Sequence, residues 1–194
     1  KKVAVMVDLH MHSLYSDGTF SVSELVKRSG EKGIKILSLT DHDTVEGLAE
    51  AAKECIENNI KFINGIEIST EYKGKEVHIL GYFIDEKDKS LIDFSNEMKQ
   101  ARINRNEKAI KILNNHGIEI TKEDTFREAE GVIISRTHLA RALIAKGYVK
   151  DVKEAFSKYL GSNGLAYVPK SNLNPFDGIE IIKKKRRVGV FSPP

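Results

Sequence analysis

Residues 3–12 read VAVMVDLHMH, and residues 34–43 read IKILSLTDHD. Each stretch starts with a short apolar run, typical of a buried strand in a parallel sheet, and ends in histidine and aspartate side chains. Between them, Ser21-Val-Ser-Glu24 matches the capping-box pattern and predicts a helix that ends at Gly33. Strand, helix and strand in this order indicate an α/β fold with a mostly parallel sheet or a barrel.

The elements expected in residues 1–90 alternate between strand and helix. Strands are predicted at Val3–His10, Ile34–Thr40, Lys61–Tyr72 and Glu76–Ile84, with a second helix at Val45–Asn59. In this second helix, Leu48, Ala52 and Ile56 are expected to form the buried face. The last two strands flank a Lys73-Gly74 turn, which is short enough for an antiparallel hairpin.

Helical periodicity dominates the following residues, where no strand pattern is longer than Val132–Ile134. Helices are predicted at Leu91–Asn115, from about Thr121, at Ser135–Lys146, at Asp151–Leu160 and at Ile179–Arg187, and a strand at Val188–Phe191. We therefore expect an N-terminal barrel part (1–90), a helical, lid-like insertion (91–170) and a return to the barrel (171–194). His116 is interpreted as a surface residue at a helix C-terminus, where it complements the dipole.

The composition is that of a globular protein. The 194 residues are 30% charged and 40% hydrophobic, and their net charge of +3 is too small to indicate nucleic-acid binding. The single Cys55 excludes a disulfide framework and a cysteine-based zinc cage. The apolar runs are too short to cross a bilayer, and no signal peptide is visible. We expect a soluble, cytoplasmic protein with no membrane partner.

The basic run Lys183-Lys-Lys-Arg-Arg187 has two interpretations. Its cations can bind a nucleic-acid backbone, but such a run is more often the solvated C-terminal end of a helix. The helical insertion has few aromatic residues among its charges, so a stacking platform for single strands is not supported. We favour the helix-end interpretation, which gives no support to duplex binding.

Candidate metal ligands lie at or near the ends of the predicted strands, and they are His10, His12, Asp17, His42, Glu67 and His78. Residues i and i+2 of a strand point to the same side, so His10 and His12 can reach one cation. Glu67 lies between Ile66 and Ile68, where an unpaired carboxylate would be costly to bury. Together, these groups are better explained by a metal centre than by separate structural roles.

Single motifs also have structural interpretations. An isolated His-x-His pair is a weak signal. The turn Thr40-Asp-His-Asp43 can begin a helix, with Asp43 or Thr44 as the N-cap. Imidazole and carboxylate donors without thiolate suit Mn²⁺, Fe²⁺ or Zn²⁺, and five or six ligands are too many for one ion. Two or three ions bridged by Glu67 are the economical interpretation, since two ions about 3.5–4 Å apart can hold a hydroxide and clamp a phosphate.

These motifs in combination resemble the polymerase and histidinol phosphatase (PHP) superfamily. The resemblance rests on Asp8-Leu-His-Met-His12, Ser16-Asp-Gly18, Thr40-Asp-His-Asp43, Gly65-Ile-Glu67 and His78-Ile-Leu-Gly81, and it covers nearly the whole chain. Ser135-Arg-Thr-His-Leu-Ala-Arg141 and Tyr167-Val-Pro-Lys170 are similar to the branch that acts on nucleoside monophosphates, 3′,5′-bisphosphonucleotides and short RNA 5′ ends. The resemblance implies a distorted (β/α)7 barrel that carries up to three divalent ions (Mn, Fe or Zn).

The resemblance also implies residue roles. It implies that a first ion is held by His10, His12 and Glu67, a second by Glu67 and His78, and a third by Asp17 and His42. Arg136 and His138 match positions that face the substrate, where a guanidinium suits a phosphate. A first helical turn with a surface arginine is the alternative there. Asp43 is a candidate proton acceptor, with the N-cap as its alternative.

The end of the sequence departs from the family pattern. Pro193 stands where the family has a ligand histidine, and a later Asp-x-His pair is absent. About five predicted strands do not close a barrel of seven. We interpret the chain as truncated at its C-terminus, with a degenerate relative as the alternative. We therefore expect an incompletely ligated metal centre and little phosphatase activity.

The leading functional hypothesis is a metal-dependent phosphoesterase. It would hydrolyse a phosphomonoester or phosphodiester of a nucleotide or short RNA 5′ end by attack of a metal-bridging hydroxide. Histidinol phosphate is the second candidate substrate, and the helical insertion with Arg136 and His138 disfavours it. The rival class is a non-catalytic metal-binding module, which the missing ligands favour.

Overall fold

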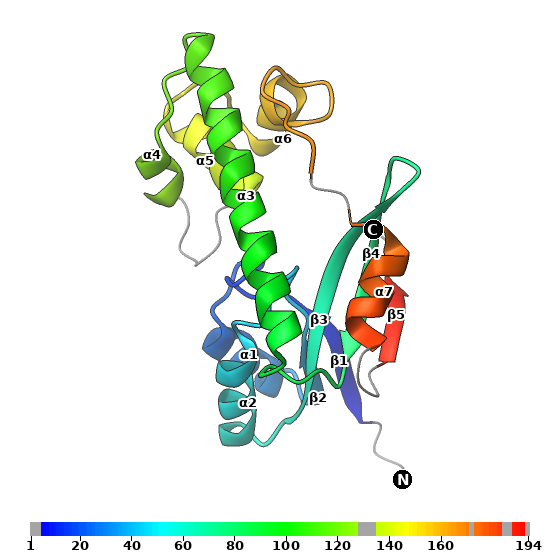
Figure 1. The fold of residues 1–194 in the computed structure, drawn as a ribbon. Coiled ribbons are helices and arrows are strands. Elements are labelled where there is room, and N and C mark those ends of the chain that lie inside the picture. Colours follow the sequence, from blue (N-terminus) through cyan, green and yellow to red (C-terminus); the bar gives the residue numbers. More distant parts are fainter. Residues whose placement is uncertain (1–4, 128–134, 171–172, 184–187, 193–194) are drawn as a thin grey trace. The chain divides into compact units, whose positions relative to one another are not determined.

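The structure is a computed structural model that describes residues 5–127, 135–170, 173–183 and 188–192. The chain forms two compact units, of which the first combines residues 1–98 with 172–194 and the second comprises residues 99–171 (Figure 1). Four predicted features lie wholly or partly outside the described residues: the start of the strand from Val3, the segment Val132–Ile134, the basic residues 184–187, and Pro193.

The first unit is built on a mixed sheet of five strands in the order β1-β2-β3-β4-β5. Its elements are β1 (Met6–Met11), α1 (Val22–Glu31), β2 (Ile34–Leu39), α2 (Leu48–Glu57), β3 (Lys61–Tyr72), β4 (Lys75–Tyr82), α7 (Pro175–Lys183) and β5 (Val188–Ser192). The first three strands are parallel, and the pairs β3–β4 and β4–β5 are antiparallel. The predicted α/β fold and the hairpin are confirmed, whereas closure into a barrel of seven strands stays a prediction.

β3 is long because it pairs with two different strands. Residues 61–64 pair with β2, and residues 65–72 pair with β4. Gly65 lies at the change of partner, where an added Cβ would stand 2.8 Å from the carbonyl oxygen of Leu39. A side chain does not fit this close approach, so glycine allows β3 to run past the end of β2.

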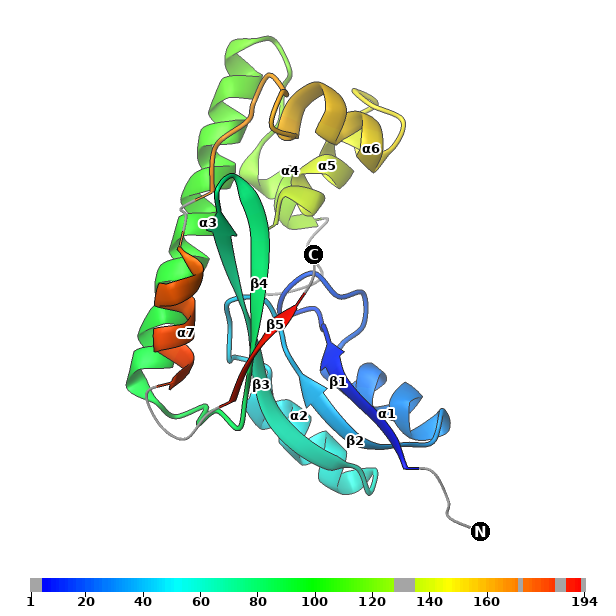
Figure 2. The same cartoon turned by 90° about the vertical axis from the view of Figure 1, so that its right-hand side faces the viewer.

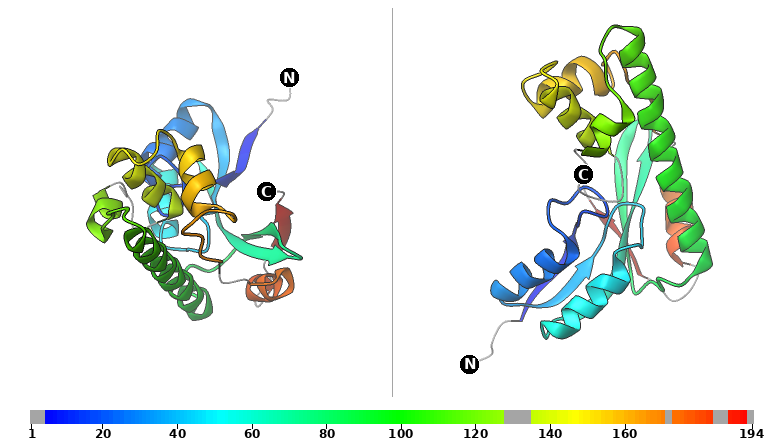
Figure 3. Two further views of the ribbon diagram at one scale, coloured as in Figure 1. Left: turned by 90° about the horizontal axis from the view of Figure 1, so that it is seen from above. Right: turned by 90° about the vertical axis from the view of Figure 1, so that its left-hand side faces the viewer.

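Helices cover the apolar side of each half of the sheet. α1 and α2 pack against each other and against β2 (Figure 3), and α7 packs against β3, β4 and β5 (Figure 2). Ile66 and Ile68 of β3 are fully buried, and an added Cβ at Gly178 of α7 would touch Ile68. Because side chains alternate along a strand, Glu67 projects from the side opposite to α7.

The expectation that the first strand is buried is wrong for its N-terminal half. Val5, Met6 and Val7 are 60%, 54% and 46% exposed. Among the described strands, β1 pairs with β2 alone and so forms one edge of the sheet. Edge strands have a neighbour on one side only, which leaves their side chains less covered.

The expected buried face of the second helix is correct at Leu48 and wrong at Ile56. α2 begins at Leu48, and its buried residues are Leu48, Ala51 and Cys55, whereas Ile56 is 77% exposed. In a helix with about 3.6 residues per turn, each step of four residues rotates by about 40°. Two such steps from Leu48 turn Ile56 toward solvent, while the spacing of three and four residues keeps Cys55 inside.

Two element boundaries differ from the prediction because of local backbone chemistry. β4 ends at Tyr82, since Phe83 adopts a positive φ of 58° that a strand does not accommodate. α7 begins at Pro175 rather than Ile179. Asn174 Oδ1 accepts a hydrogen bond from the backbone N–H of Asp177 at 3.0 Å, which caps the helix directly before its first-turn proline.

The second unit has a core of its own. It contains most of α3 (Lys89–Asn115), α4 (Lys122–Arg127), α5 (Arg136–Ala145), α6 (Val152–Ala155) and the π-helical turn η1 (Phe156–Leu160). Its largest fully buried residues are Leu113, Ile120, Leu139, Leu143 and Leu160. The single helix expected at Asp151–Leu160 is divided, because the N–H of Gly161 bonds to the carbonyl of Phe156 five residues earlier.

His116 behaves as the sequence predicts. It is exposed after the end of α3, and its ring Nδ1–H donates to the carbonyl oxygen of Ile112 at 2.8 Å. This bond satisfies one of the carbonyls that the end of a helix leaves without an intrahelical partner. None of the described helices combines the length and the apolarity needed to cross a membrane.

Candidate metal centre

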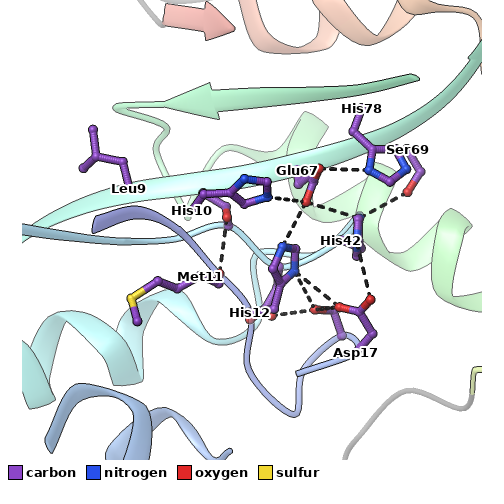
Figure 4. Close-up of polar contacts among 12 residues, drawn as sticks. Leu9, His10, Met11, His12, Asp17, His42, Glu67, Ser69 and His78 are labelled. Atoms are coloured by element: carbon purple, nitrogen blue, oxygen red, sulfur yellow. Dashed lines mark hydrogen bonds and ion pairs between the residues drawn. The ribbon is translucent and has the colours of Figure 1, made fainter. Parts of the chain in front are cut away.

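Four imidazoles surround the carboxylate of Glu67, whose side chain is only 2% exposed (Figure 4). Glu67 Oε2 lies 2.9 Å from His10 Nε2, 3.0 Å from His12 Nε2 and 3.6 Å from His42 Nδ1. Glu67 Oε1 lies 2.9 Å from His78 Nδ1. The two oxygens of one buried carboxylate thus face different histidines, which is the arrangement of a bridging ligand.

Asp17 joins the same cluster from the loop that follows β1. Its Oδ1 lies 3.4 Å from His12 Nδ1, and its Oδ2 lies 3.6 Å from His42 Nε2. The Asp17 side chain is 51% exposed, so this is the open side of the cluster. The ligand atoms form three overlapping triads within 4.8 Å, namely His10–His12–Glu67, His12–Asp17–His42 and His42–Glu67–His78. The structure therefore brings together all six predicted ligands.

The sheet explains why residues so distant in sequence meet here. β2 ends at Leu39, but the chain after it continues beside β3, where His42 and Glu67 form an isolated parallel bridge. The N–H of Asp43 donates to the carbonyl of Glu67 at 2.8 Å, and the N–H of Glu67 donates to the carbonyl of Asp41 at 3.2 Å. Glu67 itself is in the middle of β3, because β3 continues beyond the point where β2 ends.

Burial and hydrogen bonding act in opposite directions on the charges of the cluster. Burial alone would raise the pKa of Glu67, but hydrogen bonds with His12 and His78 outweigh it and hold that pKa well below its ordinary value. A hydrogen bond with Glu67 and the nearby carboxylate of Glu76 raise the pKa of His78 to about 9. Burial lowers the pKa of His42 to about 4. The site thus contains an ionised carboxylate and a buried neutral imidazole side by side.

The donor set fits divalent ions. The rings of His10, His12, His42 and His78 follow one another at centroid distances of 4.6–5.1 Å around Glu67. If all four imidazoles were protonated, their positive charges would repel one another. Deprotonated imidazoles and carboxylates, in contrast, are ligands of Zn²⁺, Fe²⁺ and Mn²⁺. Four imidazoles, Asp17 and both oxygens of Glu67 could each contribute a bond. A second metal bridged by Glu67 is consistent with this number of donors.

Sequence reasoning missed the residues that hold the Asp17 loop. Asp41 is 2% exposed and accepts hydrogen bonds from Ser13 N–H at 2.7 Å, Ser13 Oγ at 2.6 Å and Ser16 Oγ at 2.6 Å. The loop then folds back so closely that a Cβ on Gly18 would collide with the His12 carbonyl. The sequence signal that could have indicated this contact is the carboxylate directly before His42, together with the two serines between His12 and Asp17.

The N-cap interpretation of the Thr40–Asp43 turn is wrong. The N-cap residue of α2 is Gly47, and Thr44 Oγ1 accepts from the N–H of Glu46 instead. Asp43 has a positive φ of 57°, is 2% exposed, and accepts a hydrogen bond from the N–H of Ser69 at 2.7 Å. With the bond from its own N–H to the Glu67 carbonyl, this contact joins Asp43 to β3 at Glu67 and at Ser69. A proton-acceptor role for Asp43 stays a prediction.

Arg136 and His138 belong to the first turn of α5, in the second compact unit. Arg136 Nη1 donates to the carbonyl of Leu160 at 3.3 Å, and its guanidinium lies 5.4 Å from the ring centroid of Phe156. His138 Nδ1 accepts from the N–H of Ser135 at 3.0 Å, so His138 helps to cap its own helix. Their contact with a substrate stays a prediction.

Two curated relatives are similar to this chain in sequence. The chain is 36% identical over 163 residues to the 3′,5′-nucleoside bisphosphate phosphatase of Chromobacterium violaceum, covering 84% of this chain and 57% of that protein. It is 33% identical over 187 residues to the 5′-3′ exoribonuclease of Haemophilus influenzae, covering 96% of this chain and 68% of that protein. The chain therefore spans little more than half of the first relative and about two thirds of the second.

Solved structures share the fold. An amidohydrolase of Chromobacterium violaceum, solved with bound sulfate and no metal, matches with a TM-score of 0.86 and 33% identity over 97% of this chain and 66% of that one. A structure from Bifidobacterium adolescentis, described as a metal-dependent phosphoesterase, matches with a TM-score of 0.85 and 26% identity over 98% and 68%. The PHP domain model matches residues 8–164, a range that includes every candidate ligand of the cluster. By sequence, fold and site, the chain belongs to the PHP domain family.

Proposed function

We propose that this chain carries the metal centre of a phosphoesterase that hydrolyses a phosphate ester of a nucleotide or of a short RNA 5′ end. The observation that carries the proposal is the buried Glu67 carboxylate, which faces three imidazoles through one oxygen and a fourth through the other. Support for the substrate class comes from the relatives, which are named a nucleoside bisphosphate phosphatase and an exoribonuclease. Such substrates are cytoplasmic, so the proposal includes that location.

The proposed roles follow from position and exposure. His10, His12, His42, His78 and Glu67 would hold divalent ions, and Asp17 would contribute from the solvent side. Bound there, the ions would neutralise phosphate oxygens and lower the pKa of water toward neutrality. Asp43, anchored at Ser69, is the proposed proton acceptor. We further propose that residues 91–170 cover the substrate and that Arg136 and His138 contact its phosphate.

The test is a hydrolysis assay on the purified chain with Mn²⁺, Fe²⁺ or Zn²⁺. Substrates are a 3′,5′-bisphosphonucleotide, a nucleoside monophosphate, a 5′-phosphorylated oligoribonucleotide and histidinol phosphate, and the products are inorganic phosphate and mononucleotide. We expect slow, metal-dependent hydrolysis of one of the nucleotide or RNA substrates, reduced at least about 100-fold in Glu67→Gln, which removes the bridge between ions.

Two results would contradict the proposal. Metal binding without hydrolysis of any substrate would favour the non-catalytic metal-binding module. Hydrolysis of histidinol phosphate alone would move the substrate class to the second candidate. Glu71→Gln is the matched control for Glu67→Gln, because it removes the same charge from the same strand without touching the cluster.

A further inference from the structure

β4 contributes a second carboxylate, that of Glu76, next to the cluster. Glu76 precedes His78 by two residues, so both side chains project from the same face of β4. Nδ1 of His78 lies 2.9 Å from Glu67 Oε1, and Nε2 of the same ring lies 3.4 Å from Glu76 Oε1. The imidazole of His78 therefore stands between Glu67 and Glu76.

The surroundings of His78 Nε2 bear on which nitrogen of the ring carries the proton. It is shielded from solvent and makes no hydrogen bond of full geometry within the described residues. A neutral imidazole carries one N–H and one lone pair, so whichever nitrogen holds the proton leaves the other for a metal. A proton on Nε2 would point at the carboxylate of Glu76, which can accept it. A proton on Nδ1 would instead point at Glu67, the candidate bridging ligand.

We propose that Glu76 is a positioning residue that keeps the proton of His78 on Nε2 and thereby presents the Nδ1 lone pair to the metal centre. This inference rests on the metal-binding part of the proposed function. A carboxylate behind a ligating imidazole fixes its tautomer and orientation and strengthens it as a donor. Glu76 acts through His78 and is not itself a ligand, because its 53% exposed side chain lies at the nitrogen turned away from Glu67.

Glu71 provides a matched control for the charge of Glu76. It lies directly opposite Glu76 in the pairing of β3 with β4, so the two carboxylates share a face of the sheet. The backbone N–H of Glu71 donates to the carbonyl of Leu173, a contact that a side-chain substitution leaves intact. Glu71→Ala therefore removes the same charge from the same region but leaves the acceptor of His78 in place.

The experiment titrates Zn²⁺ against a competing chelator into the wild-type chain and three variants whose folding is checked by circular dichroism. We expect Glu76→Ala to weaken zinc binding about tenfold, at the low end for such partners because Glu76 is half exposed. Glu76→Gln keeps an oxygen that accepts the Nε2–H, so we expect it to recover most of that loss. Glu71→Ala should bind zinc within about twofold of wild type, because Glu71 belongs to none of the three triads of candidate ligands.

A spectroscopic readout separates positioning from general destabilisation. Long-range ¹H–¹⁵N spectra of the zinc-loaded protein with ¹⁵N-labelled histidine should show His78 protonated at Nε2 in the wild type and in Glu76→Gln. Zinc on Nε2 of His78 in the wild type would overturn the proposal, whether or not any variant folds. Equal losses in Glu71→Ala and Glu76→Ala, or no loss in Glu76→Ala, would also overturn it. Failure of the wild type to bind zinc would instead refute the proposed function, and the inference with it.

Discussion

The carboxylate of Asp41 accepts two hydrogen bonds from Ser13, one from the backbone N–H at 2.7 Å and one from the hydroxyl at 2.6 Å. Ser16 Oγ adds a third at 2.6 Å. Asp41 is followed by the candidate ligand His42, and the two serines lie in the loop between the candidate ligands His12 and Asp17. One buried carboxylate therefore joins the two segments, after β1 and after β2, that carry candidate ligands.

Replacing Asp41 should disturb both stability and metal binding. In Asp41→Asn, the charge is lost and an amide donor faces hydroxyl and N–H donors, so we expect a loss of about 2–3 kcal/mol in the free energy of unfolding. Urea titration measures it, and a zinc titration should show at least about tenfold weaker binding. Ser16→Ala removes one of the three bonds and should cost about 1 kcal/mol. An unchanged urea midpoint in Asp41→Asn would contradict this role.

Metal binding should stabilise the fold through Glu67. At a free zinc concentration of 100 times the Kd, linkage raises the free energy of unfolding by about 2.7 kcal/mol. We expect this rise in the wild type and in Glu71→Gln, its reversal by a chelator, and no rise in Glu67→Gln. Thermal and urea unfolding with and without zinc measure the effect. A normal rise in Glu67→Gln would show that zinc stabilises the chain from a different site.

The number of tightly bound ions should be two. His12 and His42 each belong to two of the three triads, but a neutral imidazole donates one lone pair to one ion. The six residues therefore cannot complete three separate triads at the same time. Elemental analysis after removal of loosely bound metal should give about two zinc ions per chain, each with three or more protein donors. Three ions that survive the same treatment would disprove this count.

Two glycine substitutions should have opposite effects. A Cβ at Gly65 would collide with β2, including the Leu39 carbonyl at 2.8 Å, so we expect Gly65→Ala to cost about 1–3 kcal/mol. Gly30 is in α1, where an added Cβ has ordinary contact with Ile60 at 3.8 Å. Gly30→Ala should stabilise the chain by up to about 1 kcal/mol. Urea unfolding compares the two variants, and equal effects would argue against the packing described at Gly65.

The buried thiol of Cys55 should make the fold less stable at alkaline pH. Burial in the core raises the pKa of its thiol from 9.0 to about 11, so the unfolded chain ionises first. The stability gained by keeping the thiol neutral is complete below pH 9 and is lost as the pH rises through 11. Over this range, the free energy of unfolding of the wild type should therefore fall more steeply with pH than that of Cys55→Ala. A thiol reagent at pH 8 should modify Cys55 promptly only in urea, and prompt reaction of the native chain would contradict its burial.

The clustering of the six candidate ligands could be predicted because most of them are polar residues in, or directly after, an apolar strand pattern. His10 and His12 share a strand face by their spacing, and Glu67 stands between isoleucines that face a helix. The strand and helix order gave the α/β class for the same reason, since periodicity is a local property. Boundaries were less accurate where one residue decides them, as at Phe83 with its positive φ.

Contacts between distant residues could not be predicted in the same way. The bonds from Ser13 to Asp41 cross 28 residues, and nothing in the local pattern specifies that partner. The capping contact of His138 with Ser135 replaces the usual glutamate or glutamine with an imidazole. The exposure of β1 depends on which strand lies beside it, and that is decided by the whole sheet.

The order of the sheet has a consequence for how a nascent chain acquires its metal. Every candidate ligand lies between residues 10 and 78, and β1 to β4 each pair with the strand next to them in the chain. Among the described strands, β5 alone must return across residues 83–187 to reach β4. Domains tend to fold from the N-terminus as the ribosome extends them. All candidate ligands are therefore synthesised before the helical unit, so the segment that carries them can begin to fold and bind metal before that unit is complete.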